Sequence, residues 1–262
     1  MSIMIIVPIL LGCIAGCVIN YLADVLPVTR RFSQPTCPQC DAIFSWRDYF
    51  SLRPCQNGHS RKARLWIVLV VMPAVSINTW MNPPSKIEYL LGIILLTYFG
   101  TVFVIDMEQR LILHPTSIFG VVLGLIVGTV SHGVKATLLG GLGGLLIMLG
   151  FYYFGVLFAR IRTKRMLALG QETDDEEALG AGDVILATIL GLMLGWPLIW
   201  FGLLLGILLG GFFSLMLILW LVVTRKYGKN ALMLFIPYGP YFIMSAFLII
   251  FFSKFVQMML PG

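Results

Sequence analysis

The sequence predicts an all-α polytopic membrane protein with about eight transmembrane helices and a small cytoplasmic insert that contains cysteines. The composition is 59% hydrophobic and only 11% charged, whereas a soluble domain carries about a quarter charged residues. The apolar runs are close to the roughly 20 residues that a membrane-crossing helix needs. The basic residues are concentrated in a few connecting loops, as membrane topology requires. The net charge of +6 therefore reflects topology and lipid contact, and we expect no nucleic-acid partner.

The apolar runs define eight expected spans. They are 3–22, 65–82, 88–105, 116–131, 137–158, 183–196, 198–222 and 235–253. No basic segment precedes the first run, which is long enough to remain a span rather than a cleaved signal peptide. The sixth span is short, which fits a helix whose polar end lies in a cavity rather than in lipid. Glycines at 140–144 and 202–211 predict close packing between helices.

The distribution of lysine and arginine predicts an N-terminus outside the membrane. With that orientation, most of the 18 basic residues lie in cytoplasmic loops. Asp106 then ends a span that runs inward, and Asp183 begins one that runs outward. Both aspartates are therefore expected at the cytoplasmic border of the membrane.

The expected organisation is a first transmembrane helix at 1–27, a cytoplasmic insert at 28–64 and a membrane domain at 65–262. The insert holds Cys37, Cys40, Cys55 and His59, whose separations suit a tetrahedral Zn²⁺ site. An insert of about 37 residues has too little core to fold without such a structural ion. The alternative is that these are ordinary reduced cysteines.

The two aspartates indicate a catalytic pair. Ionisable groups at membrane depth are costly and are functional by default. Two nearby carboxyl groups share a proton, so that one can act as base and the other as acid on a water molecule. Gly180 and Gly182 lack a β-carbon and allow close approach to Asp183. The alternative is structural: Asp183 would be a helix N-cap, and Asp106 would end its helix beside Arg110.

Five motifs occur in order along the chain. They are Gly16-Cys17-Val18-Ile19-Asn20 with Leu26-Pro27, the pair Cys37 and Cys40, Asp106 with His114-Pro115, Gly180-Ala181-Gly182-Asp183, and Ile236-Pro237-Tyr238-Gly239-Pro240. Together they resemble the bacterial type IV prepilin peptidases, the prepilin leader peptidase and N-methyltransferase family of GxGD aspartic membrane proteases.

The resemblance implies an activity and a site. Asp106 and Asp183 would be catalytic, while Gly180, Gly182, Pro237 and Gly239 would shape the active site within a protease domain at 65–262. The substrates would be type IV prepilins or the pseudopilins of type II secretion, cleaved after the glycine that ends their basic leader. This would occur at the cytoplasmic face of the bacterial inner membrane. Proteolysis would need no cofactor, and S-adenosylmethionine would be used only if the new N-terminus is also methylated.

The chain departs from the family pattern at four places. Ile185 stands where a lysine is frequent, and Asp24-Val25 stands where an arginine usually precedes Leu-Pro. The second cysteine pair of the insert is reduced to Cys55 with His59. Arg64 begins the second span, where an acidic residue is usual. These changes weaken the expectation of methylation more than that of cleavage.

Other functions fit parts of the pattern. A proton-coupled transporter also uses paired intramembrane acids. A catalytically silent relative could assist pilus or secretion assembly, and another GxGD protease would share the chemistry on other substrates. The acidic run 172–177 is expected to be a solvated tether, with attraction of the basic leader as the alternative.

Overall fold

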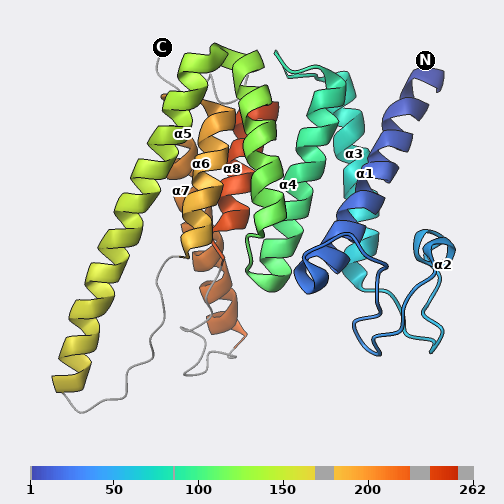
Figure 1. The fold of residues 1–262 in the computed structure, drawn as a ribbon, viewed down its shortest axis with the longest axis horizontal. Coiled ribbons are helices and arrows are strands. Elements are labelled where there is room, and N and C mark those ends of the chain that lie inside the picture. The colour runs from blue at the N-terminus through green and yellow to red at the C-terminus, as the bar shows by residue number, and fades with distance from the viewer. Residues whose placement is uncertain (1, 85, 169–179, 225–236, 253–262) are drawn as a thin grey trace. The chain divides into compact units, whose positions relative to one another are not determined.

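The computed structural model describes residues 2–84, 86–168, 180–224 and 237–252, and within these it confirms the all-α prediction. The helices are α1 (Ser2–Thr29), α2 (Trp46–Phe50), α3 (Ala63–Met81), α4 (Tyr89–Gln109), α5 (His114–Ala168), α6 (Ala181–Leu194), α7 (Leu198–Val223) and α8 (Gly239–Phe251), as Figure 1 shows. Within the described residues, β-structure is limited to one isolated bridge between Thr36 and Ile43, in the insert.

Five of the described helices are long and apolar enough to cross a membrane, and α6 and α8 are shorter apolar helices. The long helix α5 is interrupted at Gly133, whose φ of 83° and ψ of 162° are not helical. The chain reverses direction there (Figure 1), so α5 consists of two arms. These arms correspond to the expected spans 116–131 and 137–158. The total of eight spans remains a prediction.

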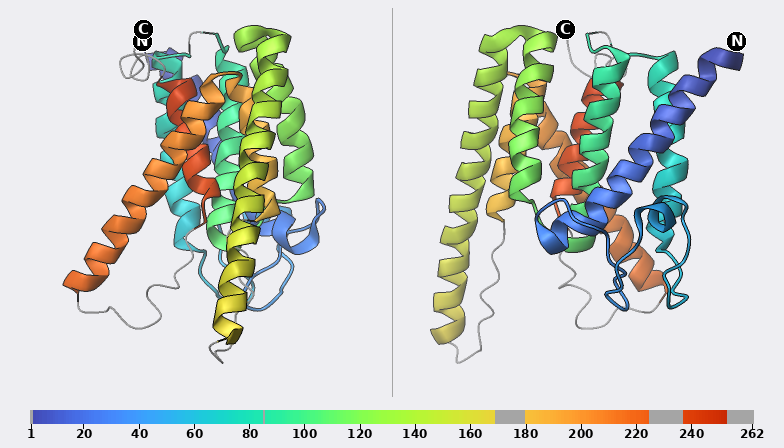
Figure 2. Two further views of the ribbon diagram at one scale, coloured as in Figure 1. Left: turned by 90° about the vertical axis from the view of Figure 1, so that its left-hand side faces the viewer. Right: turned by 45° about the vertical axis from the view of Figure 1, so that its right-hand side comes forward.

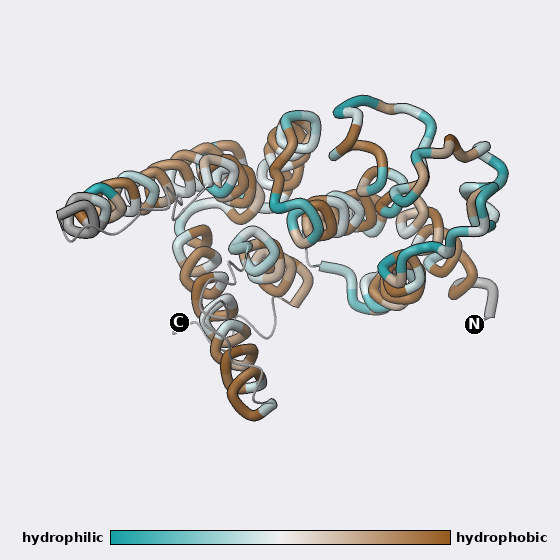
Figure 3. The backbone as a smooth tube through the Cα atoms, turned by 90° about the horizontal axis from the view of Figure 1, so that it is seen from below, coloured by the Kyte–Doolittle hydropathy of each residue, from teal (hydrophilic) through white to brown (hydrophobic). Residues whose placement is uncertain are grey.

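The helices form two compact units, which are described separately. Unit 1 comprises Met1–Thr116 and Ile250–Gly262, and unit 2 comprises Ser117–Ile249. The helices of both are largely hydrophobic, whereas hydrophilic residues are concentrated in the insert (Figure 3). The division at residues 27 and 64 that the sequence suggested remains a prediction.

Unit 1 is built around α1, which packs against α3 and α4. The approach is close because Gly12 lacks a side chain: a β-carbon there would lie 2.5 Å from the Cα of Pro73. The buried amide of Asn20 donates hydrogen bonds to the carbonyl oxygens of Gly16 (3.0 Å) and Leu65 (3.4 Å). This amide therefore links α1 to the start of α3.

Unit 2 is built around the short helix α6, most of whose side chains are buried. The second arm of α5 touches it backbone to backbone. A β-carbon on Gly140 would lie 2.3 Å from the carbonyl oxygen of Gly191, and one on Gly191 would lie 2.3 Å from that of Gly140. On α7, a β-carbon on Gly206 would lie 2.4 Å from the ring of Phe242. The predicted packing role is confirmed for Gly140 and Gly206.

Candidate active site and metal centre

Asp106 lies in the last turn of α4 and is only 5% exposed. Its carbonyl oxygen accepts a hydrogen bond of 2.9 Å from the N–H of Arg110. Arg110 ends the helix in the left-handed conformation, with φ 54°, which is uncommon outside glycine. The preceding residue, Ile105, packs in a buried cluster with Ala23 and Leu26 of α1. Asp106 is therefore held at the end of unit 1 from which the insert emerges.

An ion-pair network surrounds this end of α4. The guanidinium of Arg64 lies 2.5 Å from a carboxylate oxygen of Asp24 and 3.1 Å from one of Glu108. The ammonium of Lys62 lies 3.1 Å from the same oxygen of Glu108. The hydroxyl of Tyr49 donates a hydrogen bond of 2.6 Å to Asp24. The network thus joins α1, α3, α4 and the insert, two residues along the chain from Asp106.

Sequence reasoning missed this network. Arg64 was noted as a basic residue at the start of a span, but its side chain is 13% exposed and is paired on two sides. The sequence did contain a hint of this ion pair, because the chain departs from the family pattern by an acidic residue at Asp24 and a basic residue at Arg64. A spacing of 40 residues, however, does not indicate that the two meet.

Asp183 lies in the first turn of α6 and is half-buried. Its N–H donates a hydrogen bond of 3.0 Å to the carbonyl of Gly180, which is itself the N-cap residue. Asp183 is thus the third residue of the helix, and the N-cap alternative is wrong. An acidic side chain in this turn is favoured by the helix dipole, but that explains no particular orientation of the carboxylate.

Gly180 has no structural need to be glycine. Its φ of −78° and ψ of 146° suit any residue. A β-carbon there would meet its nearest neighbours at 3.9 and 4.0 Å, which is ordinary contact. Among the described residues, a β-carbon at Gly180 would have room beside Asp183, so neither backbone conformation nor packing there requires glycine.

Pro237 and Gly239 lie at the start of α8, on the same side of unit 2 as Asp183. A β-carbon on Gly210 of α7 would lie 3.6 Å from the ring of Tyr238. Measured along α6, Asp183 lies about 17 Å from the connection between α6 and α7 at 1.5 Å per residue. Measured along α7, Gly210 lies about 18 Å from the same connection. Because the two helices are joined end to end and pack together, this places the start of α8 level with Asp183. Figure 2 shows the same for the starts of α6 and α8.

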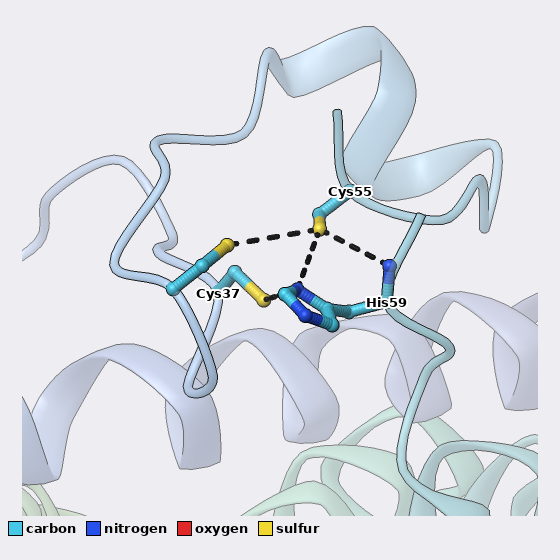
Figure 4. Close-up of side chains that lie close together, drawn as sticks. Cys37, Cys55 and His59 are labelled. Carbon is cyan, nitrogen blue, oxygen red and sulfur yellow. Dashed lines mark hydrogen bonds between the residues drawn. The ribbon is translucent and has the colours of Figure 1, made fainter. Parts of the chain in front are cut away.

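The insert brings together the four residues of the expected metal site. The ligand atoms of Cys37, Cys40, Cys55 and His59 all lie within 4.8 Å of one another, and Figure 4 shows three of them turned toward a common point. The sulfurs of Cys40 and Cys55 are 3.8 Å apart, and Nδ1 of His59 lies 3.3 Å from Cys55 and 3.9 Å from Cys37. In a tetrahedral Zn²⁺ site with bonds of about 2.3 Å to sulfur and 2.0 Å to nitrogen, these separations would be about 3.5–3.8 Å. The donor set therefore fits a structural zinc ion.

The electrostatics of the insert favour thiolates. Burial by itself raises the pKa of the Cys55 thiol, but hydrogen bonds from the backbone of His59 and Asn57 and from the neighbouring thiols lower it to about 6. The backbone at Ala42 likewise lowers the pKa of Cys40. Thiolate is the form that binds metal, so the fold favours that form at Cys40 and Cys55, whereas burial raises the pKa of Cys37.

A cavity of about 410 Å³ lies next to both the metal-binding residues and the ion-pair network. Its lining includes Cys37 and His59 of the first and Asp24 and Arg64 of the second. The cluster and the network are thus neighbours within unit 1.

The two aspartates belong to different units, Asp106 to unit 1 and Asp183 to unit 2, so their pairing remains a prediction. Ile236 and the acidic run 172–177 lie outside the described residues.

Comparison with known proteins gives one finding. No curated protein and no solved structure matches the chain significantly. Residues 93–215 match the sequence profile of the type IV leader peptidase family. This region contains Asp106, Asp183 and both glycines that flank the latter. Through residues 93–215, just under half of its length, the chain is similar to the type IV leader peptidase family.

Proposed function

We propose that this protein is a membrane-embedded aspartic endopeptidase in which Asp106 and Asp183 share the acid and base roles. The observation that carries the proposal is that the family match contains both residues. Each is a carboxyl group at the end of an apolar helix, and in Asp106 it is almost fully buried. A purely structural role as helix caps would not explain why both aspartates lie at helix ends and also fall within the region that matches the family.

The chemistry follows from the two side chains. The ionised carboxylate takes a proton from a water molecule, whose oxygen attacks the carbonyl carbon of the scissile peptide bond. The protonated carboxyl group donates its proton to the carbonyl oxygen. As the carbon–nitrogen bond breaks, the nitrogen takes up the proton first removed from water. One hydroxyl group of the tetrahedral intermediate returns its proton to the other aspartate, and the two products leave as acid and amine. The pair ends with one proton, as it began, so neither aspartate is assigned permanently to one role.

We infer that the substrates are type IV prepilins or pseudopilins, cleaved at the cytoplasmic border of the inner membrane. A prepilin carries its apolar segment already in the membrane, so an active site at a helix end is reached along the bilayer. The open space beside Gly180 supports access to Asp183. The start of α8, with Pro237 and Gly239, would border that access because it lies level with Asp183.

The insert is assigned a structural role. Cys37, Cys40, Cys55 and His59 would hold a zinc ion, which supplies folding free energy to a segment with a small core. No step of the peptide hydrolysis uses it. N-methylation with S-adenosylmethionine remains an expectation of the resemblance, because no feature of the described residues favours it.

The test is cleavage of a prepilin in membranes by the unaltered protein and by Asp106→Asn and Asp183→Asn. Asparagine keeps the shape of the side chain and removes the titrating group, so each variant should insert normally and process nothing. Asp48→Asn is the matched control, because this aspartate lies in the insert with an exposed partner, Arg53. Continued processing by both active-site variants would show that the aspartates are structural. Failure of the unaltered protein on every prepilin offered would favour the silent relative.

A further inference from the structure

The short helix α2 carries an exposed aromatic pair. Trp46 and Phe50 are four residues apart and lie on one face of the helix. Their rings are stacked, with centroids 6.1 Å apart and planes at 13°. They are 43% and 48% exposed. Two adjacent large apolar rings exposed on one loop indicate an interaction surface rather than a solvated tip.

The opposite face of α2 is already used by the insert. Tyr49 is buried in a cluster with Phe44, Cys37 and Cys55. The guanidinium of Arg61 lies over both aromatic rings of this cluster, 4.2 Å from Phe44 and 4.4 Å from Tyr49. One side of α2 thus packs against the rest of the insert, and the side with Trp46 and Phe50 is directed away from it.

The outward face lies beside the membrane-crossing helices. The ring of Trp46 is 5.5 Å from that of Tyr21 in α1. Phe50 and Leu52 line a gap of about 10 Å³ together with Cys17 and Leu69. Figure 1 shows α2 at the level of the last turns of α1 rather than beyond them. The insert therefore reaches back along the two spans from which it emerges.

The depth of this contact can be judged from helix rise. Cys17 lies in the middle of the candidate span Ile5–Thr29. Leu69 is six residues into α3, about 9 Å from its first residue at 1.5 Å per residue. Amphipathic segments that bind a membrane surface place their apolar side about 5–10 Å into the boundary between headgroups and acyl chains. Phe50 and Leu52 thus lie alongside the two candidate spans, within their length rather than beyond their ends.

Basic residues accompany the aromatic pair. Arg47 on α2 and Arg53 just after it are exposed, as are Arg30 and Arg31 at the end of α1. Tryptophan is favoured at membrane interfaces, and clustered arginines are attracted to anionic lipid. Arg53 already pairs with Asp48, but an apolar protein groove would offer no complementary charge to Arg30, Arg31 and Arg47, so the combination matches a lipid leaflet better.

We propose that α2 is an interfacial membrane anchor of the insert, in which Trp46 and Phe50 enter an anionic lipid leaflet and Arg47 and Arg53 contact its headgroups. The anchor does not depend on peptidase activity. It fixes the insert to the bilayer at the end of unit 1 that carries Asp106. The insert is then held at three places: by α2 in lipid, by its own metal-binding cluster, and by the bond of Tyr49 to Asp24.

The test uses the full chain reconstituted in bilayers that contain phosphatidylglycerol. The difference between the emission of the unaltered protein and of Trp46→Phe reports Trp46 alone among the six tryptophans. Lipids brominated near the headgroup should quench most of this difference, and iodide in the water should quench little of it. The reverse pattern would overturn the proposal.

A second measurement covers the case in which the Trp46→Phe variant disturbs the insert. A photoreactive phenylalanine analogue is placed at Phe50 or, as matched control, at the exposed Asn57 in the turn between Cys55 and His59. The analogue at Phe50 should crosslink to lipid, with a yield that falls when phosphatidylglycerol is replaced by neutral lipid, and the analogue at Asn57 should not. Crosslinking of Phe50 mainly to a second copy of the chain or to a pilin, or equal lipid yields at both positions, would refute a lipid anchor.

Discussion

Arg64 and Asp24 form an ion pair of 2.5 Å between the start of α3 and the end of α1, and Arg64 also reaches Glu108 at the end of α4. The three side chains are mostly buried. One guanidinium thus connects three helices of unit 1 beside Asp106. Arginine suits this role because its planar group can meet two carboxylates at once.

Replacing Arg64 with methionine should destabilise unit 1. The change leaves the carboxylates of Asp24 and Glu108 poorly solvated and without this cation, which should cost about 1–3 kcal/mol. Arg64→Lys should recover part of the loss, because lysine keeps the charge but not the forked geometry. Chemical denaturation in detergent measures both.

Arg53→Met is the control for this experiment. It removes an ion pair with Asp48 in which both side chains are well exposed, so its effect should be below about 1 kcal/mol. Equal losses for Arg53→Met and Arg64→Met would contradict the structural role of the network.

Much of the fold could be predicted from the sequence, because long apolar runs determine helices by length and composition alone. The positions of Asp106 at the end of a helix and Asp183 near the start of another followed from the same runs. The ion pair of Asp24 with Arg64 could not be predicted, since it joins residues 40 apart and depends on how α1 and α3 pack. The helix α2 was also missed, because its five residues are too few to show a periodicity.

Tyr49→Phe should make the insert less sensitive to alkaline pH. Burial, the nearby charge of Asp24 and the hydrogen bond to it hold the pKa of Tyr49 far above its usual range. The unfolded tyrosine loses its proton near pH 10, while the folded one keeps it, so stability falls as the pH rises above about 10. The variant lacks this contribution.

The comparison is best made by unfolding both proteins between pH 8 and 11. The difference in unfolding free energy between the unaltered protein and Tyr49→Phe should shrink with rising pH, starting from about 1 kcal/mol for the lost hydrogen bond. A constant difference across this range would show that Tyr49 is not buried as described.

Gly180→Ala should separate activity from stability. A β-carbon at this position meets only ordinary contacts, so the stability should change by less than about 0.5 kcal/mol. If substrate occupies the space beside Asp183, the added methyl group should lower prepilin cleavage roughly tenfold or more by misplacing it.

Substitutions at two other glycines serve as controls for the stability measurement. Gly140→Ala should be strongly destabilising, because its β-carbon would lie 2.3 Å from the backbone of Gly191, while Gly150→Ala meets nothing within 4 Å. Full activity of Gly180→Ala at unchanged stability would remove the access role assigned to this glycine.

The metal centre predicts one zinc ion per chain. Metal analysis of the purified protein should find about one equivalent, lost in Cys55→Ser and retained in Cys13→Ser, whose cysteine lies in α1 away from the cluster. Loss of the ion should also expose residues 28–64 to added protease, because the insert depends on it for folding. Negligible zinc in protein prepared without chelators would end this assignment.

The contact between Gly140 and Gly191 has a consequence for the direction in which Asp183 points. Helix α6 is clamped where its backbone touches that of α5, and Asp183 lies eight residues from Gly191, at the far end of a lever of about 12 Å. A small tilt of α6 at this contact would displace the carboxylate sideways without changing any residue around it. The two glycines therefore help to fix the position of Asp183 through α6, and a substitution at 140 or 191 that shifts α6 would also move the carboxylate.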